Sequence, residues 1–281
     1  MQKLVTLTRL ATVAAALLLI AVLAAPPVDA QAGSGGGALD IRVTARVSGK
    51  FVSAAGVEPP GFDVDLLRRF AAWHKVRTGQ EARLAFSYSS TVAPVLEAVQ
   101  KRTADLGVGG ITATAERAKL VDFSAATLPV RSVLVAPPGI LDAKRWRDQL
   151  KGGLRLGATI GSTNAAEVDR VAATLGGVKV NTSFASNEAV FDALGGTRQL
   201  DAALVDLPQY WTTGKQKGLV LVDSVGQPQS MAIVLRKGSP LKAEVDQFLE
   251  GFTHSSDYFQ LIRRYFGGDA EQMVRLSRGQ G

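Results

Sequence analysis

The segment LRLGATIGSTNAAEVDRVAATL (residues 154–175) contains the pattern that decides the fold. Residues 154–159 are mostly apolar and predict a short strand. A glycine-containing turn then leads at once into apolar residues at helical spacing over 162–174. The order repeats downstream, with a strand predicted at 178–182, a helix at 188–194 and a strand at 202–205. Such alternation is typical of α/β layers with mostly parallel strands.

A similar series precedes this segment. Its predicted elements are a strand at 41–45, helices at 64–73 and 95–101, and strands at 105–109 and 132–136. A late strand at 231–235 and two helices at 241–252 and 258–266 follow the second series. Two series predict two α/β lobes, and ligands in such folds bind beyond the carboxyl ends of the strands.

The first thirty residues differ from the rest of the chain. Lys3 and Arg9 give a basic start, an uncharged apolar run covers 10–25, and Val28-Asp29-Ala30 resembles a cleavage site. This layout predicts a secretory signal peptide over 1–30, and therefore a periplasmic protein. The alternative is a membrane anchor, but the apolar run is shorter than the roughly 20 residues that a spanning helix needs. The glycine-rich stretch 31–38 is predicted to be a flexible leader.

The composition excludes several classes of function. The chain has no cysteine, which rules out disulfides and thiol chemistry. The net charge is +7, but Lys and Arg are scattered with no more than two adjacent, so we expect a generally basic surface and no nucleic-acid partner. The two histidines, His74 and His254, lie in separate predicted helices away from other metal ligands. We therefore expect no metal site and no cofactor.

Several short motifs occur in a fixed order along the chain. They are Gly61-Phe62-Asp63-Val64-Asp65-Leu66, Ala104-Asp105-Leu106, Gly110-Ile111-Thr112 with Glu116-Arg117, Val121-Asp122-Phe123-Ser124, Gly161-Ser162-Thr163, Asp201-Ala202-Ala203 with Asp206-Leu207-Pro208, and Lys237-Gly238. Each motif alone is weakly specific. As an ordered set over residues 39–266, they resemble the family 3 extracellular solute-binding proteins of amino-acid ABC importers.

The resemblance implies a type II periplasmic-binding-protein-like α/β fold with two lobes joined by a two-segment hinge. Lobe 1 would contain residues 39–127 and 229–281, and lobe 2 would contain residues 128–228. The two crossings would lie near Ala126–Leu128 and Gln227–Gln229. Such a protein closes around its ligand, so the resemblance predicts that ligand binding favours the closed state.

The resemblance implies that Arg117 binds the α-carboxylate of an amino acid. The planar guanidinium suits bidentate pairing with a carboxylate, which is costly to bury unpaired. The hydroxyl of Thr112 can donate to the same region, and Gly110 lets the backbone approach the ligand, with its carbonyl free to accept from the ammonium. The alternative for Arg117 is a surface role at a helix start, because Thr114 and Glu116 resemble capping chemistry.

The second lobe would supply the remaining contacts. Ser162 and Thr163 begin a predicted helix, whose N–H groups favour an anion, although either residue can instead be a simple N-cap. Asp206 ends a predicted strand and resembles the family aspartate that accepts from the α-ammonium; its alternative is a strand-end cap. The acids in the segment 62–65 are interpreted as part of a helix-capping turn.

Arg46 bears on the identity of the ligand. Its place in the first strand resembles that of an Arg in glutamate- and aspartate-binding members, which favours an acidic amino acid. The second Arg of those members is not evident, because residues 89–92 read Ser-Ser-Thr-Val. The alternative is that Arg46 pairs with Asp40, Glu58 or Asp63 outside the pocket.

The usual aromatic wall is weakly represented. Gly49 and Val92 stand near places where members of the family stack a ring on the ligand. Phe51 or Tyr88 can substitute, although core packing is favoured for Phe51. The ligand is therefore expected to be small or polar.

We expect a monomeric binding protein and not an enzyme, with a membrane ABC permease as its partner. One alternative is a periplasmic dehydratase of the same fold that acts on prephenate- or arogenate-type acids. Its motif would place a Glu directly after Ser162-Thr163-Asn164, whereas this chain has two alanines before Glu167. The other alternative is a ligand-sensing module that signals to a membrane partner, and the end of the chain soon after Phe266 favours a free-standing binder.

Overall fold

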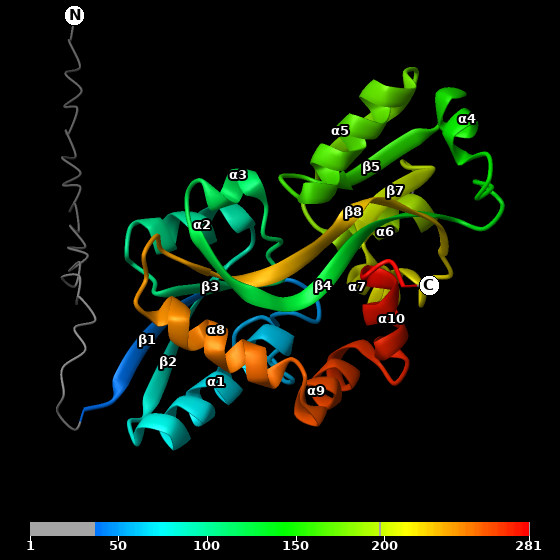
Figure 1. Ribbon diagram of the computed structural model, residues 1–281. Coiled ribbons are helices and arrows are strands. Elements are labelled where there is room, and N and C mark those ends of the chain that lie inside the picture. Colours follow the sequence, from blue (N-terminus) through cyan, green and yellow to red (C-terminus); the bar gives the residue numbers. More distant parts are fainter. Residues whose placement is uncertain (1–36, 197, 281) are drawn as a thin grey trace, which may run out of the picture. The chain divides into compact units, whose positions relative to one another are not determined.

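The computed structural model describes residues 37–196 and 198–280 (Figure 1). The predicted signal peptide and most of the predicted leader therefore lie outside the described residues. Within the described ranges, none of the helices has the length and apolar character needed to cross a membrane.

Eight strands form one sheet in the order β2-β1-β3-β8-β4-β7-β5-β6. The strands are β1 (Leu39–Arg46), β2 (Ala82–Ser89), β3 (Leu106–Val108), β4 (Asp122–Ala136), β5 (Arg155–Thr159), β6 (Lys179–Phe184), β7 (Ala202–Asp206) and β8 (Val220–Leu235). Both ends of the sheet are parallel, through β2-β1-β3 and β7-β5-β6, whereas the pairs in the middle that involve β4 and β8 are antiparallel. We call β2-β1-β3 with the helices α1 (Phe62–Thr78) and α2 (Val92–Gln100) the first end. We call β7-β5-β6 with α5 (Thr163–Leu175) and α6 (Asn187–Gly195) the second end.

The predicted α/β class is confirmed, but the prediction of mostly parallel sheets is wrong for the middle of the sheet. β4 and β8 are long strands that join the two ends, because β8 pairs with β3 and β4 pairs with β7. From the sequence, only residues 132–136 and 231–235 of these strands were predicted. Their other parts contain Pro129, Gly226 and Pro228 among polar residues. These residues hide the apolar alternation by which a strand is recognised.

The helices cover the sheet, and several of them begin at a side-chain cap. They are α1 (Phe62–Thr78), α2 (Val92–Gln100), α3 (Ala115–Ala118), α4 (Trp146–Lys151), α5 (Thr163–Leu175), α6 (Asn187–Gly195), α7 (Leu207–Gln209), the π-helical turn η1 (Tyr210–Gly214), α8 (Leu241–Phe252), α9 (Ser256–Phe266) and α10 (Ala270–Ser277). Ser162, Ser186 and Ser255 each accept a hydrogen bond from a backbone N–H in the first turn of α5, α6 and α9. These caps fix where the three helices begin.

The two ends of the sheet are fastened by the same side-chain arrangement. In the middle of β1, Arg42 donates through Nε and Nη2 to the carboxylate of Asp105 at 3.0 and 2.8 Å, and its backbone N–H donates at 2.9 Å. At the start of β5, Arg155 makes the same three bonds to Asp201 at 2.9, 2.9 and 2.8 Å. Each fork ties a strand to the residue just before its parallel neighbour.

The pairing of β4 with β8 is irregular where the sequence predicted the crossings. The register shifts between Phe123 and Ala126, between Ala126 and Leu128, and again between Val130 and Ser132. Bulges of this kind bend a strand locally. Tyr258 of α9 donates from its hydroxyl to the carbonyl of Thr127 at 2.8 Å, so the C-terminal helices are attached to this irregular stretch.

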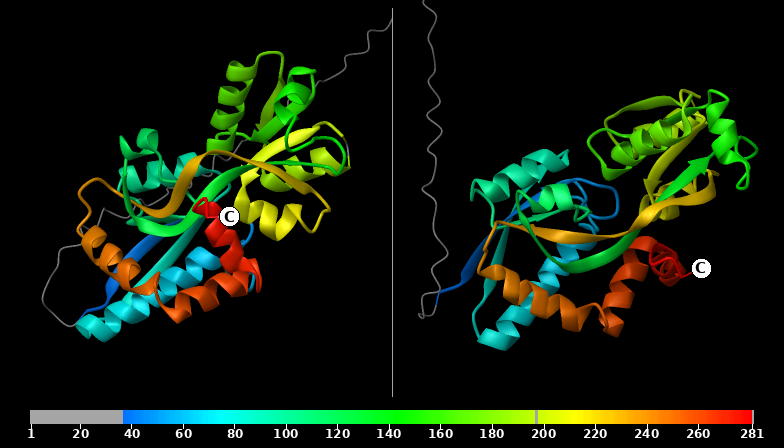
Figure 2. Two further views of the ribbon diagram at one scale, coloured as in Figure 1. Left: turned by 45° about the vertical axis from the view of Figure 1, so that its right-hand side comes forward. Right: turned by 45° about the horizontal axis from the view of Figure 1, so that its top comes forward.

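The helices divide between the two sides of the β4–β8 pair. In Figures 1 and 2, α8, α9 and α10 lie on one side of these strands, and α3 and α5 lie on the other. The tail also reaches the second end of the sheet, because Asp269 accepts a hydrogen bond from the indole N–H of Trp211 in η1 at 3.2 Å. The C-terminal helices therefore contact both ends of the sheet.

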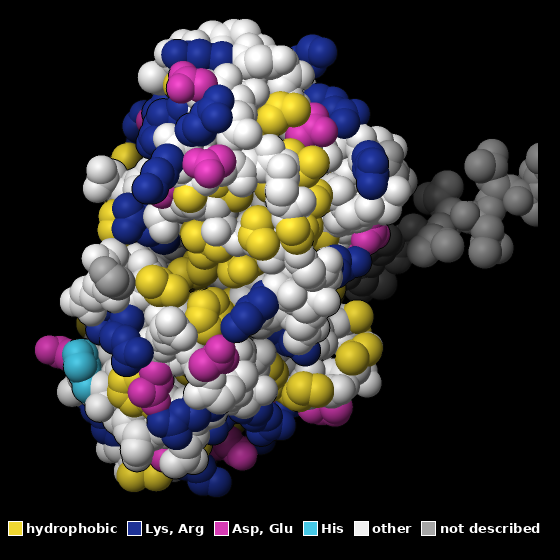
Figure 3. All heavy atoms as spheres, turned by 90° about the vertical axis from the view of Figure 1, so that its right-hand side faces the viewer, with side chains coloured by type: hydrophobic (Ala, Val, Ile, Leu, Met, Phe, Trp, Pro, Cys, Tyr) yellow, Lys and Arg dark blue, Asp and Glu magenta, His cyan; other side chains and the backbone are white. Residues whose placement is uncertain are grey.

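The basic side chains are dispersed over the face of the molecule drawn in Figure 3. On the face drawn in Figure 3, Lys and Arg side chains are dispersed among acidic, apolar and uncharged ones. This face has no broad surface of a single charge.

Candidate ligand-binding site

Asp63 anchors the loop that follows β3. Its Oδ2 accepts hydrogen bonds from the backbone N–H groups of Gly109 and Gly110, each at 2.8 Å. Burial of this carboxyl raises the pKa of Asp63 to about 6. The expected capping turn is wrong in detail: α1 begins after Gly61 without a side-chain cap, and Asp63 reaches across to another loop. The acid is structural through this long-range contact.

Gly110 has a φ of +62°, which a residue with a Cβ adopts only with strain. A Cβ added there would lie 2.9 Å from the ring of Phe51. That ring is buried against Phe62 and Phe266, so Phe51 belongs to the core. The glycine is thus required by the loop and by Phe51, and the predicted close approach to a ligand stays a prediction. Tyr88 is exposed on the edge strand β2.

Arg46 is the last residue of β1 and turns toward the same loop. Its Nε and Nη2 donate to the carbonyl of Gly109 at 2.9 and 2.8 Å, and Nη2 also donates to Ser48 Oγ at 2.7 Å. A longer bond from Nη2 to the Gly110 carbonyl measures 3.4 Å. Within the described residues, Nη1 has no protein partner. Burial lowers the pKa of Arg46, and the charges of Asp206, Asp63 and Glu188 act in the opposite direction.

No ion pair joins Arg46 to Asp40, Glu58 or Asp63 in the part of the chain that the structure describes. Asp63 is near enough to act on Arg46 through its charge, but its hydrogen bonds go to the loop after β3. The guanidinium of Arg46 is therefore held by backbone carbonyls, and one of its nitrogens remains available.

Arg117 combines the two roles considered for it. Its backbone N–H donates to the Thr114 hydroxyl at 3.2 Å, which caps the short helix α3. Its Nη1 donates to the Thr112 carbonyl at 2.8 Å, which leaves Nε and Nη2 without a protein partner among the described residues. Burial is the main cause of a lowered Arg117 pKa; the charge of Arg46 adds to the lowering, and Asp206 opposes it. Thr112 itself is buried and pairs through its backbone with Met231 of β8.

Asp206 ends β7 and faces the two guanidinium groups. Burial raises the pKa of Asp206, and a hydrogen bond from Asn164 together with the charges of Arg46 and Arg117 opposes the rise. The Asn164 Nδ2 donates to Asp206 Oδ1 at 3.0 Å. Arg46, Arg117 and Asp206, which come from both ends of the sheet, are therefore close enough to act on one another through their charges.

The start of α5 lies beside Asp206. Ser162 is its N-cap: the hydroxyl accepts from the N–H of Ala165 at 3.1 Å and donates to the Thr159 carbonyl at 2.6 Å. The helix start predicted here is confirmed. Thr163 is the first residue of the helix and is partly exposed. A ligand contact by Ser162 or Thr163 stays a prediction.

A cavity of about 60 Å³ lies between the two ends of the sheet, beside Arg46. Ser48, Lys50 and Phe51 line it from the first end, and Glu188 and Gln209 line it from the second end. This volume holds a few water molecules and is smaller than typical ligand pockets.

The sequence analysis missed Asn164, Glu188 and Gln209. Asn164 was detectable as a polar residue in the first turn of a helix predicted to face the ligand. Gln209 follows Asp206-Leu207-Pro208 directly, but its burial depends on packing between elements that are distant in sequence. Glu188 was named only as the first residue of a predicted helix.

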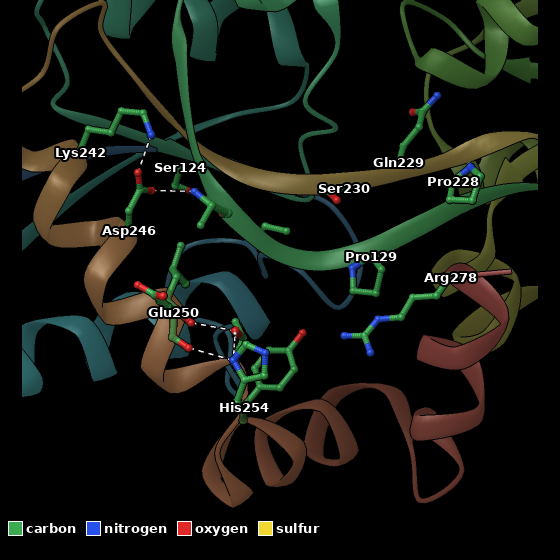
Figure 4. Close-up of a pocket in the computed structure, with 16 residues that line it drawn as sticks. Ser124, Pro129, Pro228, Gln229, Ser230, Lys242, Asp246, Glu250, His254 and Arg278 are labelled. Atoms are coloured by element: carbon green, nitrogen blue, oxygen red, sulfur yellow. Dashed lines mark hydrogen bonds and ion pairs between the residues drawn. The ribbon is translucent and has the colours of Figure 1, made fainter. Parts of the chain in front are cut away.

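A larger cavity of about 810 Å³ lies between the strands β4 and β8 and the helices α8, α9 and α10 (Figure 4). Lys242 and Asp246 form an ion pair at its rim, and Asp246 also accepts from the N–H of Ala125 at 2.6 Å. Arg278 extends into it from the end of α10. None of the ligand-binding residues predicted from the sequence lines this cavity.

Comparison with known proteins places the chain in a family. Residues 46–268 match bacterial extracellular solute-binding proteins, family 3. The chain belongs to this family. The sequence-based resemblance is therefore confirmed, and so is the predicted type II periplasmic-binding-protein fold.

Solved structures similar to this family 3 protein match 81% of it, over nearly the whole of their own chains. The GluR0 ligand-binding core from Nostoc punctiforme in complex with L-glutamate is 25% identical, with a TM-score of 0.66 over 81% of this chain and 99% of the other. An ancestral arginine-binding protein, solved with arginine and with glutamine, is 26% identical in each case, with TM-scores of 0.65 and 0.63 over 81% of this chain and 98% of the other.

A third structure bears on the enzyme alternative. An ancestral amino acid-binding protein, a precursor of cyclohexadienyl dehydratase, is 22% identical, with a TM-score of 0.66 over 81% of this chain and 95% of the other. At this identity the likeness extends to the fold alone. The family and its similar structures are mostly binding proteins, in agreement with the expectation of a non-enzyme.

Proposed function

We propose that this family 3 protein captures a free amino acid between the two ends of its sheet and delivers it to a membrane ABC permease. The observation that carries the proposal is that Arg46, Arg117 and Asp206 are close enough to act on one another through their charges, with Arg46 and Asp206 at the carboxyl ends of β1 and β7. Ligands of α/β folds bind at this edge of the sheet. The similar structures hold glutamate, arginine and glutamine, all of which share the α-carboxylate and α-ammonium.

The α-carboxylate is assigned to Arg117. Its bond to the Thr112 carbonyl uses Nη1 and fixes the orientation of the guanidinium. The remaining Nε and Nη2 form the fork that pairs with both oxygens of a carboxylate. Because Arg117 is partly buried, an anion that replaces its remaining water compensates the desolvation of the charge.

The α-ammonium is assigned to Asp206, assisted by Asn164. Burial disfavours the charged form of Asp206, as the direction of its pKa shows, and an ammonium group at hydrogen-bond distance restores that form. Asn164 holds Oδ1 of Asp206, so the other carboxylate oxygen can accept from the ligand. The buried Asn164 Oδ1 has no partner in the described part of the chain and provides a second acceptor.

Hinged closure would unite these contacts. Arg117 follows β3 in the first end, whereas Asp206 ends β7 in the second, so a ligand that binds both favours the conformation in which they are close. The proposed lobes are residues 39–127 with 229–281, and residues 128–228. The register shifts of β4 against β8 support a hinge near Ala126–Leu128 and Gln227–Gln229.

Export to the periplasm and a monomeric state are part of the proposal. The family's description as extracellular supports the first. Arg46, through its available Nη1, would bind an oxygen on the ligand's side chain, which either an acidic amino acid or a carboxamide supplies.

The structure offers little support for a dehydratase. The first acid after Asn164 is Glu167, whose carboxylate forms an ion pair with Arg170 of the same helix. A Cβ on Gly226 of β8 would lie 3.2 Å from the same carboxylate. Glu167 is therefore already occupied by a structural contact.

The proposal is tested by thermal unfolding of the purified protein with a panel of amino acids. A ligand at 100 times its dissociation constant should stabilise the folded state by about 2.7 kcal/mol. Arg117→Ala should abolish this shift, whereas Arg83→Ala, on the exposed side of the edge strand β2, should leave it unchanged. An unchanged shift in Arg117→Ala contradicts the site, and turnover of prephenate by the protein would move it to the enzyme class.

A further inference from the structure

The cavity beside Arg46 contains hydrogen-bonding groups that the proposed clamp does not use. Gln209 is only 9% exposed, and within the described residues its Oε1 has no hydrogen-bond partner. Glu188, in the first turn of α6, lines the same cavity and forms no ion pair in the described part of the chain. Both residues belong to the second end of the sheet and line the cavity.

A buried amide without a partner is unfavourable. An unpaired acceptor of this kind costs about 1–3 kcal/mol, so Gln209 is a position where a bound molecule gains by supplying a donor. Rotation about the last side-chain bond of Gln209 exchanges its oxygen and nitrogen, so the amide can present either atom to the cavity. A complementary group would itself carry both a donor and an acceptor.

Three carboxylates already act on the positive charge of Arg46, those of Asp206, Asp63 and Glu188, although burial has the larger effect and lowers the pKa of Arg46. The available Nη1 of Arg46 can donate to an uncharged oxygen as well as to an anion. Lys50 also lines the cavity and, like Glu188, is exposed to water.

We propose that Gln209 and Glu188 select an amino acid whose side chain ends in an uncharged carboxamide, as in glutamine or asparagine. The inference rests on the proposed function, because it assumes that the α-groups are held by Arg117 and Asp206. The carboxamide oxygen accepts from Arg46 Nη1, and the carboxamide NH₂ donates to Gln209 and Glu188. An acidic side chain would place a like charge beside Glu188, and a basic one would face Arg46.

Titration calorimetry of the purified protein with glutamine, asparagine, glutamate, aspartate, arginine and alanine tests this choice. We expect one of the two carboxamides to bind about tenfold or more tightly than its acidic counterpart, glutamate or aspartate, of the same length. Tighter binding of the acid or of arginine overturns the carboxamide inference and leaves the amino-acid clamp standing. If no amino acid in the panel binds, the proposed function itself fails.

Two variants separate the roles of the cavity residues. Gln209→Leu should weaken the carboxamide about tenfold and leave alanine unchanged, because alanine does not reach the cavity. Glu188→Gln should narrow the preference for the carboxamide over the acid, because the like charge is gone. Gln247→Leu and Glu97→Gln, exposed on α8 and α2, are the matched controls and should change neither ratio. Equal weakening of alanine and carboxamide in Gln209→Leu would indicate a purely structural role and overturn the assignment.

Discussion

The two ends of the sheet are built alike where their strands begin and differ where their strands finish. Arg42 with Asp105, and Arg155 with Asp201, make the same three hydrogen bonds at the amino ends of β3 and β7. At the carboxyl ends, the first end presents Arg46, with Arg117 beyond it, whereas the second presents the carboxylate of Asp206.

Because of this difference, one sheet can bind both charged groups of a zwitterion. The forks stabilise the parallel strands of each end, and their charges are the same at both ends. The two ends differ in charge at the opposite edge of the sheet, where one end has hydrogen-bond donors and the other has acceptors. An amino acid placed between them has its carboxylate and ammonium directed to different halves of the molecule.

The largest effect on ligand binding is expected when the negative charge at the carboxyl end of β7 is removed. Asp206→Asn should weaken amino-acid binding about 100-fold or more, because the ligand's ammonium loses its ionic partner. In the unaltered protein, affinity should be complete above the raised pKa of Asp206 and should fall as the pH decreases through it, since a bound ammonium favours the charged carboxylate. Calorimetry across a pH series measures both effects, and a pH-independent affinity would contradict the assignment.

A second test compares the glycines that follow the strands of the two ends. Gly110→Ala should destabilise the fold by about 2–4 kcal/mol, because the positive φ strains the backbone and the new Cβ meets Phe51. Gly161→Ala shares the positive φ but has nothing within 4 Å of its Cβ, so we expect about 1–2 kcal/mol. Urea unfolding distinguishes the two. Equal losses would mean that the contact with Phe51 does not shape the first end.

The smallest effects should come from the forks, where the two ends are alike. Asp105→Ala and Asp201→Ala each leave one backbone N–H without its partner, which costs about 1 kcal/mol. The guanidinium bonds are partly exposed to water and add little. The two losses should agree within about 0.5 kcal/mol in urea unfolding. A loss at one end alone would show that the forks are not equivalent.

Much of this arrangement could be predicted from the sequence because it is encoded locally. The helix at 241–252 matches α8 to the residue, and Ser162 occupies the cap position of α5. β2 was missed although Leu84, Phe86 and Tyr88 alternate with smaller or polar residues, which is the pattern of a half-buried strand. The continuity of the sheet was missed because β4 and β8 are interrupted by proline and glycine.

The site was less predictable than the fold because its partners are distant in sequence. Arg46, Arg117 and Asp206 could be named from motifs, but the capture of Arg46 by the Gly109 carbonyl and the crossing of Asp63 depend on how β1, α1 and β3 pack together. Gln209 and Glu188 gain a meaning only when the two ends of the sheet face each other. Local sequence patterns do not predict contacts between residues that are distant in the sequence.

The central claim is that the donor end holds the carboxylate and the acceptor end holds the ammonium of a single ligand. Titration calorimetry tests it most directly with the tightest-binding amino acid and two analogues, one without the α-ammonium and one without the α-carboxylate. If both ends bind the ligand, each analogue should bind about 100-fold more weakly than the parent amino acid. An analogue that binds as tightly as the parent would contradict the two-ended clamp.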